Sequence, residues 1–163
     1  PENLGTLIVN ESSRTEKIAK AIAIKRDITV ITINSTRMLD AYGFLAKIFD
    51  IFKKHHVVVD MVSTSEVSVS VTVDKKDNLD KAIGELNRFA TVNVEENKAI
   101  VCIVGEGLHH TSNIVGPLFS VLGRNNINIE MISQGASEIN IGFVVKAEDA
   151  ENAVRVLHKE YFG

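Results

Sequence analysis

The sequence predicts an α+β fold made of two related modules, each an antiparallel sheet with its helices on one face. Three observations predict it: a stretch of about seventy residues occurs twice, apolar residues recur at helical spacing in four segments, and short β-branched runs lie between those segments. Two copies are too few for a repeat array, so the repeat indicates a duplicated small domain.

The two copies align element by element. Met61 in the first copy matches Met131 in the second, and Ser65-Glu66-Val67 matches Ser137-Glu138-Ile139. Chance similarity between short apolar runs would not preserve this order. The copies differ most where a small ligand would bind.

Four helices are predicted from apolar residues at the i, i+3, i+4 and i+7 positions of one helix face. The four stripes are Leu45, Ile48, Phe49 and Phe52; Leu79, Ala82, Ile83 and Leu86; Val115, Leu118, Phe119 and Leu122; and Ala150, Ala153, Val154 and Leu157.

Strands are predicted from alternation and from β-branched runs. Valines at 67, 69, 71 and 73 alternate with serine and threonine, which indicates one packed and one polar face. Each copy reads strand, helix, strand, strand, helix, the order of the ferredoxin-like βαββαβ unit. The right-handed crossover rule then places both helices on one face of each sheet.

The number of strands predicts how the two modules are threaded. Residues 91–95 complete the first unit, whereas the second copy ends with a helix over 149–159 and lacks a last strand. We therefore predict that a strand upstream of the first copy crosses back to complete the second sheet, so that the first module is inserted within the second. The resulting division is a flank over 1–27, with strand 6–10 and a connecting helix over 14–25, a first module over 28–97 and a second module over 98–163.

Composition and charge exclude several classes of partner. The chain has 45% hydrophobic and 24% charged residues, a net charge of -3 and no Lys/Arg run, so nothing attracts nucleic acid or an anionic membrane. No apolar run is long enough to span a bilayer, and no stretch has the features of a signal peptide. The single cysteine, Cys102, fits a reducing compartment. Because the chain begins with Pro1, we expect it to be part of a longer protein.

The loop between the first strand and first helix of the first copy is the best candidate for a ligand site. Asp40 can cap the helix, and Gly43 lets the backbone of the first turn approach a ligand closely. Free amides and the positive end of the helix dipole favour a carboxylate, while Asp60 on the next strand could bind an ammonium. These charges match the zwitterionic end of a free amino acid. The alternative is a plain capped helix with Asp60 as a solvated strand residue.

The second copy lacks this combination. Ser112 or Thr111 can cap its first helix, and Glu130 stands where Asp60 stands, one methylene longer. We therefore expect a structural role for the second module.

No catalytic or metal-binding constellation is found. The adjacent histidine pairs at 55–56 and 109–110 have no supporting Cys/His cluster, so we expect no metal. Gly105-Glu106-Gly107 lacks the third glycine of a dinucleotide fingerprint. Cys102 lies in an apolar strand and is expected to be an inert thiol. We expect the chain itself not to be an enzyme.

Three segments carry a resemblance to a known family: 38–49, 59–69 and 131–141. Over essentially all 163 residues the chain resembles the C-terminal regulatory region of aspartate kinases, which contains two ACT modules. The segment 5–8 resembles the exit from the catalytic domain, which is itself absent. The sequence is most similar to the lysine-sensitive monofunctional forms.

The resemblance implies a parent enzyme that phosphorylates the β-carboxylate of L-aspartate with ATP and Mg, and a regulatory region without a cofactor of its own. That region binds an end-product amino acid and inhibits the kinase; L-lysine is the favoured effector and L-threonine the alternative. It implies a homodimer formed through the ACT sheets, in the cytoplasm or, in a plant, in a plastid. A stand-alone ACT pair, acting as a sensor or dimerisation module without a kinase, is the alternative.

The resemblance also implies an effector site in the first module, near a dimer interface. Main-chain amides near Phe44 and Leu45 would take the α-carboxylate and Asp60 the α-ammonium, while Glu66 or Asp40 would face a side-chain ammonium. The residues carried over by motif are Met38, Asp40, Ala41, Gly43, Phe44, Leu45, Val58, Val59, Asp60, Ser65 and Glu66.

Two departures from the lysine-sensitive pattern concern the same site. The Asp40-Ala41 pair differs from the His-Ser pair of some relatives, and Val58 replaces a serine. As a hypothesis, effector binding re-angles two ACT modules across the dimer interface, and the catalytic domain senses that shift through residues 14–28.

Overall fold

The computed structural model describes residues 19–38, 42–108, 112–135 and 139–162. Within these residues the chain forms four helices and a six-stranded antiparallel sheet with strand order β2-β3-β1-β4-β6-β5. The elements are β1 (Ala21–Asn34), η1 (Thr36–Met38), α1 (Phe44–Lys54), β2 (Val62–Thr64), β3 (Ser68–Val73), α2 (Leu79–Leu86), β4 (Thr91–Val104), η2 (Glu106–Leu108), α3 (Val115–Arg124), β5 (Met131–Gln134), β6 (Asn140–Lys146), η3 (Ala147–Asp149) and α4 (Ala150–Phe162).

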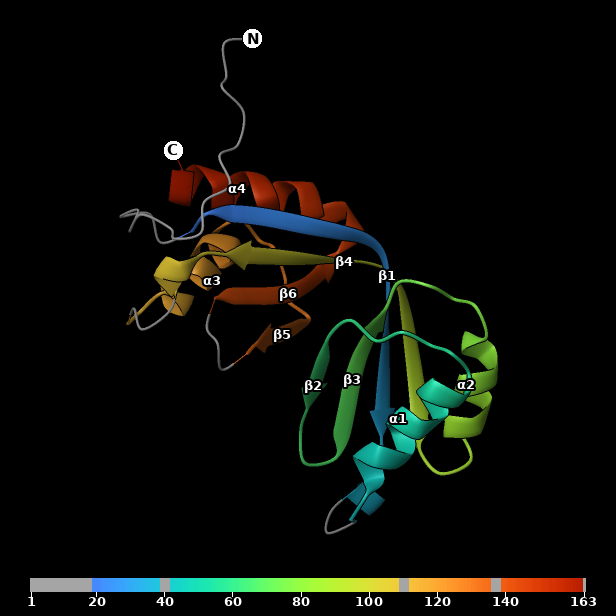
Figure 1. The fold of residues 1–163 in the computed structure, drawn as a ribbon. Coiled ribbons are helices and arrows are strands. Elements are labelled where there is room, and N and C mark those ends of the chain that lie inside the picture. Colours follow the sequence, from blue (N-terminus) through green and yellow to red (C-terminus); the bar gives the residue numbers. More distant parts are fainter. Residues whose placement is uncertain (1–18, 39–41, 109–111, 136–138, 163) are drawn as a thin grey trace, which may run out of the picture.

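Two long strands, β1 and β4, run through both modules. The second half of β1 pairs with β3 and the first half of β4, whereas the first half of β1 pairs with the second half of β4. The pairing is interrupted where Asp27 and Asn97 take positive φ values of 58°, a conformation that Asp and Asn tolerate better than most residues. Figure 1 shows both strands bending there, with a separate pair of helices on each side of the bend.

The predicted insertion of the first module within the second is confirmed. The first module has its complete βαββαβ order between the second half of β1 and the first half of β4, and the second module takes its remaining strand from upstream.

The identity of that upstream strand differs from the prediction. Residues Ala21–Lys25 pair with Ile100–Val104 and are strand, although the sequence predicted them as the end of a helix over 14–25. Ile18 and Ile22 are four residues apart in the sequence, a spacing that fits a helix. The alternation of alanine and isoleucine over 21–24 fits a strand, and in the structure Ile22 packs from that strand on the core of the second module. The predicted strand 6–10 and residues 14–18 lie outside the described residues.

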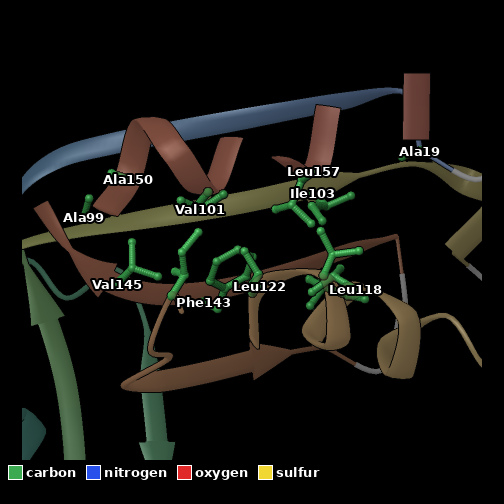
Figure 2. Packing of buried hydrophobic residues seen from close by; sticks show 14 of the residues in the cluster. Ala19, Ala99, Val101, Ile103, Leu118, Leu122, Phe143, Val145, Ala150 and Leu157 are labelled. Atoms are coloured by element: carbon green, nitrogen blue, oxygen red, sulfur yellow. The ribbon is translucent and has the colours of Figure 1, made fainter. Parts of the chain in front are cut away.

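Each module has its own core between its sheet and its two helices. Figure 2 shows the core of the second module, where Phe143 and Leu122 lie between the sheet and the helices. The first module has an equivalent core around Phe52 and Leu86. A third cluster lies on the opposite face of the sheet, where the modules meet: Ile28, Val30, Ile100, Met131 and Val144, with Met61 packed against them.

Candidate functional site

Helix α1 begins at Phe44, directly after a glycine in a left-handed conformation. Gly43 holds the cap position with φ 78° and makes no side-chain cap. The sequence predicted Asp40 for this role, which is wrong because the cap position falls three residues later; Asp40 and Ala41 lie outside the described residues. The amides of the first helical turn have no partner within the helix and lie at its positive end, so this helix start can receive a carboxylate.

The residues around the helix start are partly structural. Met38 and Phe44 are half-buried and pack on the core of the first module, and the Phe44 ring meets Phe89 edge-on with 5.7 Å between centroids. Leu45 is exposed instead. Ser65 and Glu66 lie in the exposed turn between β2 and β3, where the Ser65 hydroxyl is 2.6 Å from that of Ser68.

Asp60 is exposed, as in the solvated alternative, but its carboxylate is paired within the chain. Its main-chain amide donates to the Thr72 carbonyl at 2.9 Å, which fixes the extended segment before β2 against β3. The Lys25 ammonium lies 2.7 and 2.8 Å from the two Asp60 carboxylate oxygens. The same ammonium lies 2.9 Å from the Asp74 carboxylate. Sequence reasoning missed Lys25 because the predicted helix over 14–25 placed it outside the sheet.

A single chain does not bring Asp60 and the start of α1 together. Asp60 lies beside Thr72 of β3, and Thr72 pairs with Val30 of β1. From Val30, β1 continues to Asn34 before the chain turns toward α1. Four residues of strand span about 13 Å. Figure 1 shows the start of α1 at the opposite end of the module from the coil that enters β2. Ser65 and Glu66 lie at the same end as the helix start, because the Ser35 amide bonds to the Val67 carbonyl.

An unpaired, apolar sheet edge lies beside these groups. β2 ends the sheet, and in the part of the chain that the structure describes no strand pairs with its outer side. Four exposed apolar residues lie along α1, β2 and the segment between them: Leu45, Phe49, Val58 and Val62. Val59 packs on the core, so Val58 is the neighbour that faces outward.

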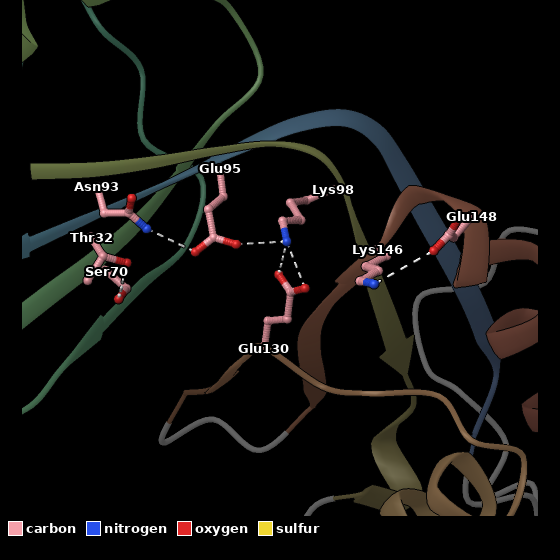
Figure 3. A network of polar contacts seen from close by, with 8 residues as sticks. All are labelled: Thr32, Ser70, Asn93, Glu95, Lys98, Glu130, Lys146 and Glu148. Atoms are coloured by element: carbon pink, nitrogen blue, oxygen red, sulfur yellow. Dashed lines mark hydrogen bonds and ion pairs between the residues drawn. The ribbon is translucent and has the colours of Figure 1, made fainter.

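The second module neutralises its equivalent acid differently. The Lys98 ammonium lies 2.6 Å from one Glu130 carboxylate oxygen and 3.0 Å from Glu95 (Figure 3). The Lys98 side chain is only 8% exposed. Burial opposes its charge, but hydrogen bonds to Glu130 and Glu95 outweigh burial, and the pKa of Lys98 is raised. This group is a structural ion cluster around a buried ammonium, with Glu95 at its exposed side.

Two further expectations concern the second module. The cap position of α3 belongs to Ile114, so Ser112 does not hold it as predicted, while Thr111 lies outside the described residues. Burial raises the pKa of the Cys102 thiol, which disfavours the reactive thiolate at neutral pH.

The fold defines a pair of ferredoxin-like modules, and comparison with known families agrees. A family profile described as the ACT domain matches residues 31–88 and 101–161. The chain belongs to the ACT-domain family. Within the described residues no helix is long and apolar enough to cross a membrane.

Within that family, the chain is similar to the regulatory regions of aspartate kinases. Aspartokinase 1, chloroplastic, of Arabidopsis thaliana is 41% identical over 171 residues, which cover 99% of this chain and 30% of the relative. Among solved structures, E. coli aspartokinase III in complex with lysine and aspartate (T-state) is 36% identical with a TM-score of 0.82, over 93% of this chain and 35% of that one. The ligand-free regulatory subunit of aspartate kinase from Thermus thermophilus is 28% identical with a TM-score of 0.77, over 90% of this chain and 99% of the subunit.

These comparisons confirm the resemblance to the tandem ACT region of aspartate kinases. The chain spans about 30% of the length of the curated relative.

Proposed function

We propose that this chain is the allosteric region of an aspartate kinase and binds a free end-product amino acid, with L-lysine as the favoured effector. The kinase reaction itself, with ATP and Mg, belongs to a catalytic domain outside this chain. We place the parent enzyme in the cytoplasm, or in a plastid if the source is a plant.

The proposal rests on two groups of complementary charge, the start of helix α1 and the Asp60 carboxylate, which lie beside the unpaired edge strand β2. The start of α1 favours an α-carboxylate and Asp60 favours an α-ammonium, but they lie at opposite ends of the module. The part of β1 from the level of Asp60 to its end at Asn34 alone is about 13 Å long. A single α-amino acid is too short to reach both.

Two copies paired through β2 would remove that separation. Antiparallel pairing of an edge strand with its own copy is the isologous contact of a two-fold dimer. If the two-fold axis of the dimer passed near Ser63, Asp60 of one copy would face Glu66 of the other copy. Glu66 lies at the end of the first module where α1 begins. The exposed side chains of Val58, Val62 and Leu45 would be covered in the same step.

That arrangement supplies one partner for each charge of lysine. The amides at Phe44 and Leu45 receive the α-carboxylate, Asp60 the α-ammonium and Glu66 the side-chain ammonium, with Met38, Gly43, Val59 and Ser65 around them. Asp40 is the other candidate for the side-chain ammonium, with Ala41 beside it. Support for lysine comes from the similarity to the E. coli structure, which is described as a complex with lysine and aspartate.

Inhibition then requires the effector to bind the inhibited arrangement more tightly than the active one. Typical coupling energies are about 1–3 kcal/mol. β1 belongs to both modules, its second half to the first module and its first half to the second. A change at the dimer edge of the first module is therefore passed along β1 toward the upstream domain.

Calorimetry of the chain with L-lysine tests the proposal, with L-threonine and L-methionine as parallel titrants. Asp60→Asn removes one charge-assisted contact and is expected to weaken lysine binding by about 1.5–3 kcal/mol, which is roughly 10- to 150-fold in Kd. Asp77→Asn, an exposed acid in a turn, is the matched control and leaves Kd unchanged. Equal affinity of wild type and Asp60→Asn would remove the proposed site, and tighter binding of threonine would replace lysine as the effector.

Sedimentation tests the dimer separately. The chain is expected to sediment as a dimer, and Val62→Glu, which places a charge on the exposed edge of β2, is expected to yield monomers that no longer bind lysine. A monomeric wild-type chain with full lysine affinity would contradict the two-copy site.

A further inference from the structure

The carboxylate that is proposed to bind the effector already holds an ammonium from its own chain. Lys25 Nζ lies 2.7 Å from Asp60 Oδ1 and 2.9 Å from Asp74 Oδ2, so one cation bridges two acids. Asp60 precedes β2 and Asp74 follows β3, so the two acids lie at the same end of this antiparallel pair, and Lys25 reaches them from the first half of β1. Both hydrogen bonds, that to Asp60 first, raise the pKa of Lys25, so it stays charged at neutral pH.

The Lys25 head group is chemically the same as the head group of the effector. Each is a primary ammonium with three N–H donors and no acceptor. Asp60 therefore cannot offer its full hydrogen-bonding capacity to both. The effector and Lys25 compete for one acceptor.

Lys25 can move because it is exposed and flexible. Its side chain is 44% exposed and has a four-carbon stem. Asp74 remains as a second acceptor, so Lys25 would not lose all its charge pairing when it leaves Asp60. We infer that Lys25 is a displaceable internal counter-ion that occupies the ammonium site of Asp60 in the empty protein and yields it to an α-amino acid, retaining Asp74. This inference rests on the proposed function.

The second module shows the opposite arrangement and explains why its acid is not a ligand site. Lys98 comes from the module's own β4, is held by Glu95 as well as Glu130, and has a side chain only 8% exposed. A buried ammonium cannot swing into solvent without leaving two acids unpaired. The same acidic position in the repeat is therefore permanently filled in one copy and exchangeable in the other.

Competition predicts a distinctive pattern in a double-mutant cycle with L-lysine as the probe. Lys25→Met removes the competitor, and because exposed ion pairs are weak, lysine is expected to bind about two- to five-fold more tightly. Asp74→Asn removes the fallback acceptor and is expected to weaken lysine binding by a similar factor. In the Lys25→Met background, Asp74→Asn is expected to have no effect.

Two measurements separate this pattern from a general structural effect. Lys76→Met removes another exposed lysine, paired with Glu96 at 2.8 Å, and is expected to leave the lysine Kd unchanged. In the wild-type chain, NMR of lysine side-chain ammonium groups is expected to show the Lys25 Nζ resonance shift as L-lysine is added, while that of Lys98 stays fixed.

The outcomes distinguish failure of the inference from failure of the proposed function. Unchanged or weaker lysine binding by Lys25→Met, while Asp60→Asn still reduces affinity, overturns the counter-ion role and leaves the effector site standing. If Asp60→Asn and Lys25→Met both leave lysine affinity unchanged, the site itself is wrong and the counter-ion role falls with it. A Lys25 resonance that does not move during saturation also overturns the inference.

Discussion

The Met61 side chain of the first module packs over Gly142 of the second: a Cβ built on Gly142 would lie 3.5 Å from Met61 Cε and 3.6 Å from Met61 Sδ. Gly142 sits in β6 opposite Cys102, and Met61 belongs to the cluster that joins the modules. The Met61 side chain therefore covers Gly142 on the face of the sheet without helices, at a distance that leaves room for a methyl group.

Substitution of Gly142 tests how closely the modules are packed. Alanine would make only ordinary contacts, the nearest at 3.5 Å, so Gly142→Ala is expected to change stability by less than about 1 kcal/mol. Gly142→Val adds two methyl groups against Met61 and is expected to cost about 1–3 kcal/mol through overpacking. Urea unfolding measures both. Equal stability of the two variants would mean that the contact is loose.

Gly43 and Gly84 form a matched pair for testing the helix start. A Cβ on either residue would meet nothing within 4 Å, but Gly43 has φ 78° whereas Gly84 lies within helix α2. Gly43→Ala is therefore expected to destabilise the chain by about 1–2 kcal/mol through backbone strain alone, and Gly84→Ala to stabilise it by about 0.5–1 kcal/mol. Thermal unfolding gives both values. Stabilisation by Gly43→Ala would show that the turn adopts another conformation.

The overall fold could be predicted because the apolar residues of its helices and strands recur at regular spacings. The stripes that begin at Leu79 and Ala150 lie in α2 and α4, and the alternating valines from Val69 to Val73 lie in β3. The missing strand of the second module predicted the insertion, since a ferredoxin-like unit leaves its sheet incomplete without it. The strand over 21–25 was missed because a short run of alternating alanine and isoleucine over 21–24 fits both a helix and a strand, and only its pairing with Ile100–Val104 decides between them.

The sequence proposes residues for the candidate site, but it does not show how they are arranged in space. Helix α1 has 11 residues and is therefore about 16 Å long, so groups before its start and after its end cannot meet in one chain. Motif spacing does not show this. The Lys25–Asp60 pair joins residues 35 positions apart, and no local pattern indicates which lysine reaches which acid.

The Glu85 carboxylate should make stability depend on pH in the acid range. Hydrogen bonds from Lys54 and then His55 lower the pKa of Glu85 from 4.5 to about 2. Because the folded-state pKa is lowered, the contribution of Glu85 to stability is complete above pH 4.5 and is lost as the pH falls toward 2. Glu85→Gln is expected to lower Tm at pH 7 and to match the wild type near pH 2.

The control for that series is Glu148→Gln. Glu148 is highly exposed and lies 3.8 Å from Lys146 Nζ, so its removal is expected to leave the pH profile of Tm unchanged. A Glu85→Gln deficit that persists undiminished at pH 2 would point to packing rather than charge.

Replacement of Lys98 is expected to lower the free energy of unfolding far more than replacement of an exposed lysine. Lys98→Met would leave Glu130 and Glu95 facing each other beside the module junction without a cation, and Glu130 is largely shielded from solvent. Removing one partner of a buried pair costs about 3–5 kcal/mol, so a loss of about 3 kcal/mol is expected, against less than about 1 kcal/mol for Lys76→Met at the surface.

Adding Glu130→Leu to Lys98→Met should recover most of the loss of stability, because the double variant no longer contains the unpaired Glu130 carboxylate. Urea unfolding of the single and double variants measures this recovery, and a double variant no more stable than Lys98→Met alone would show that the cost comes from lost packing of the lysine stem.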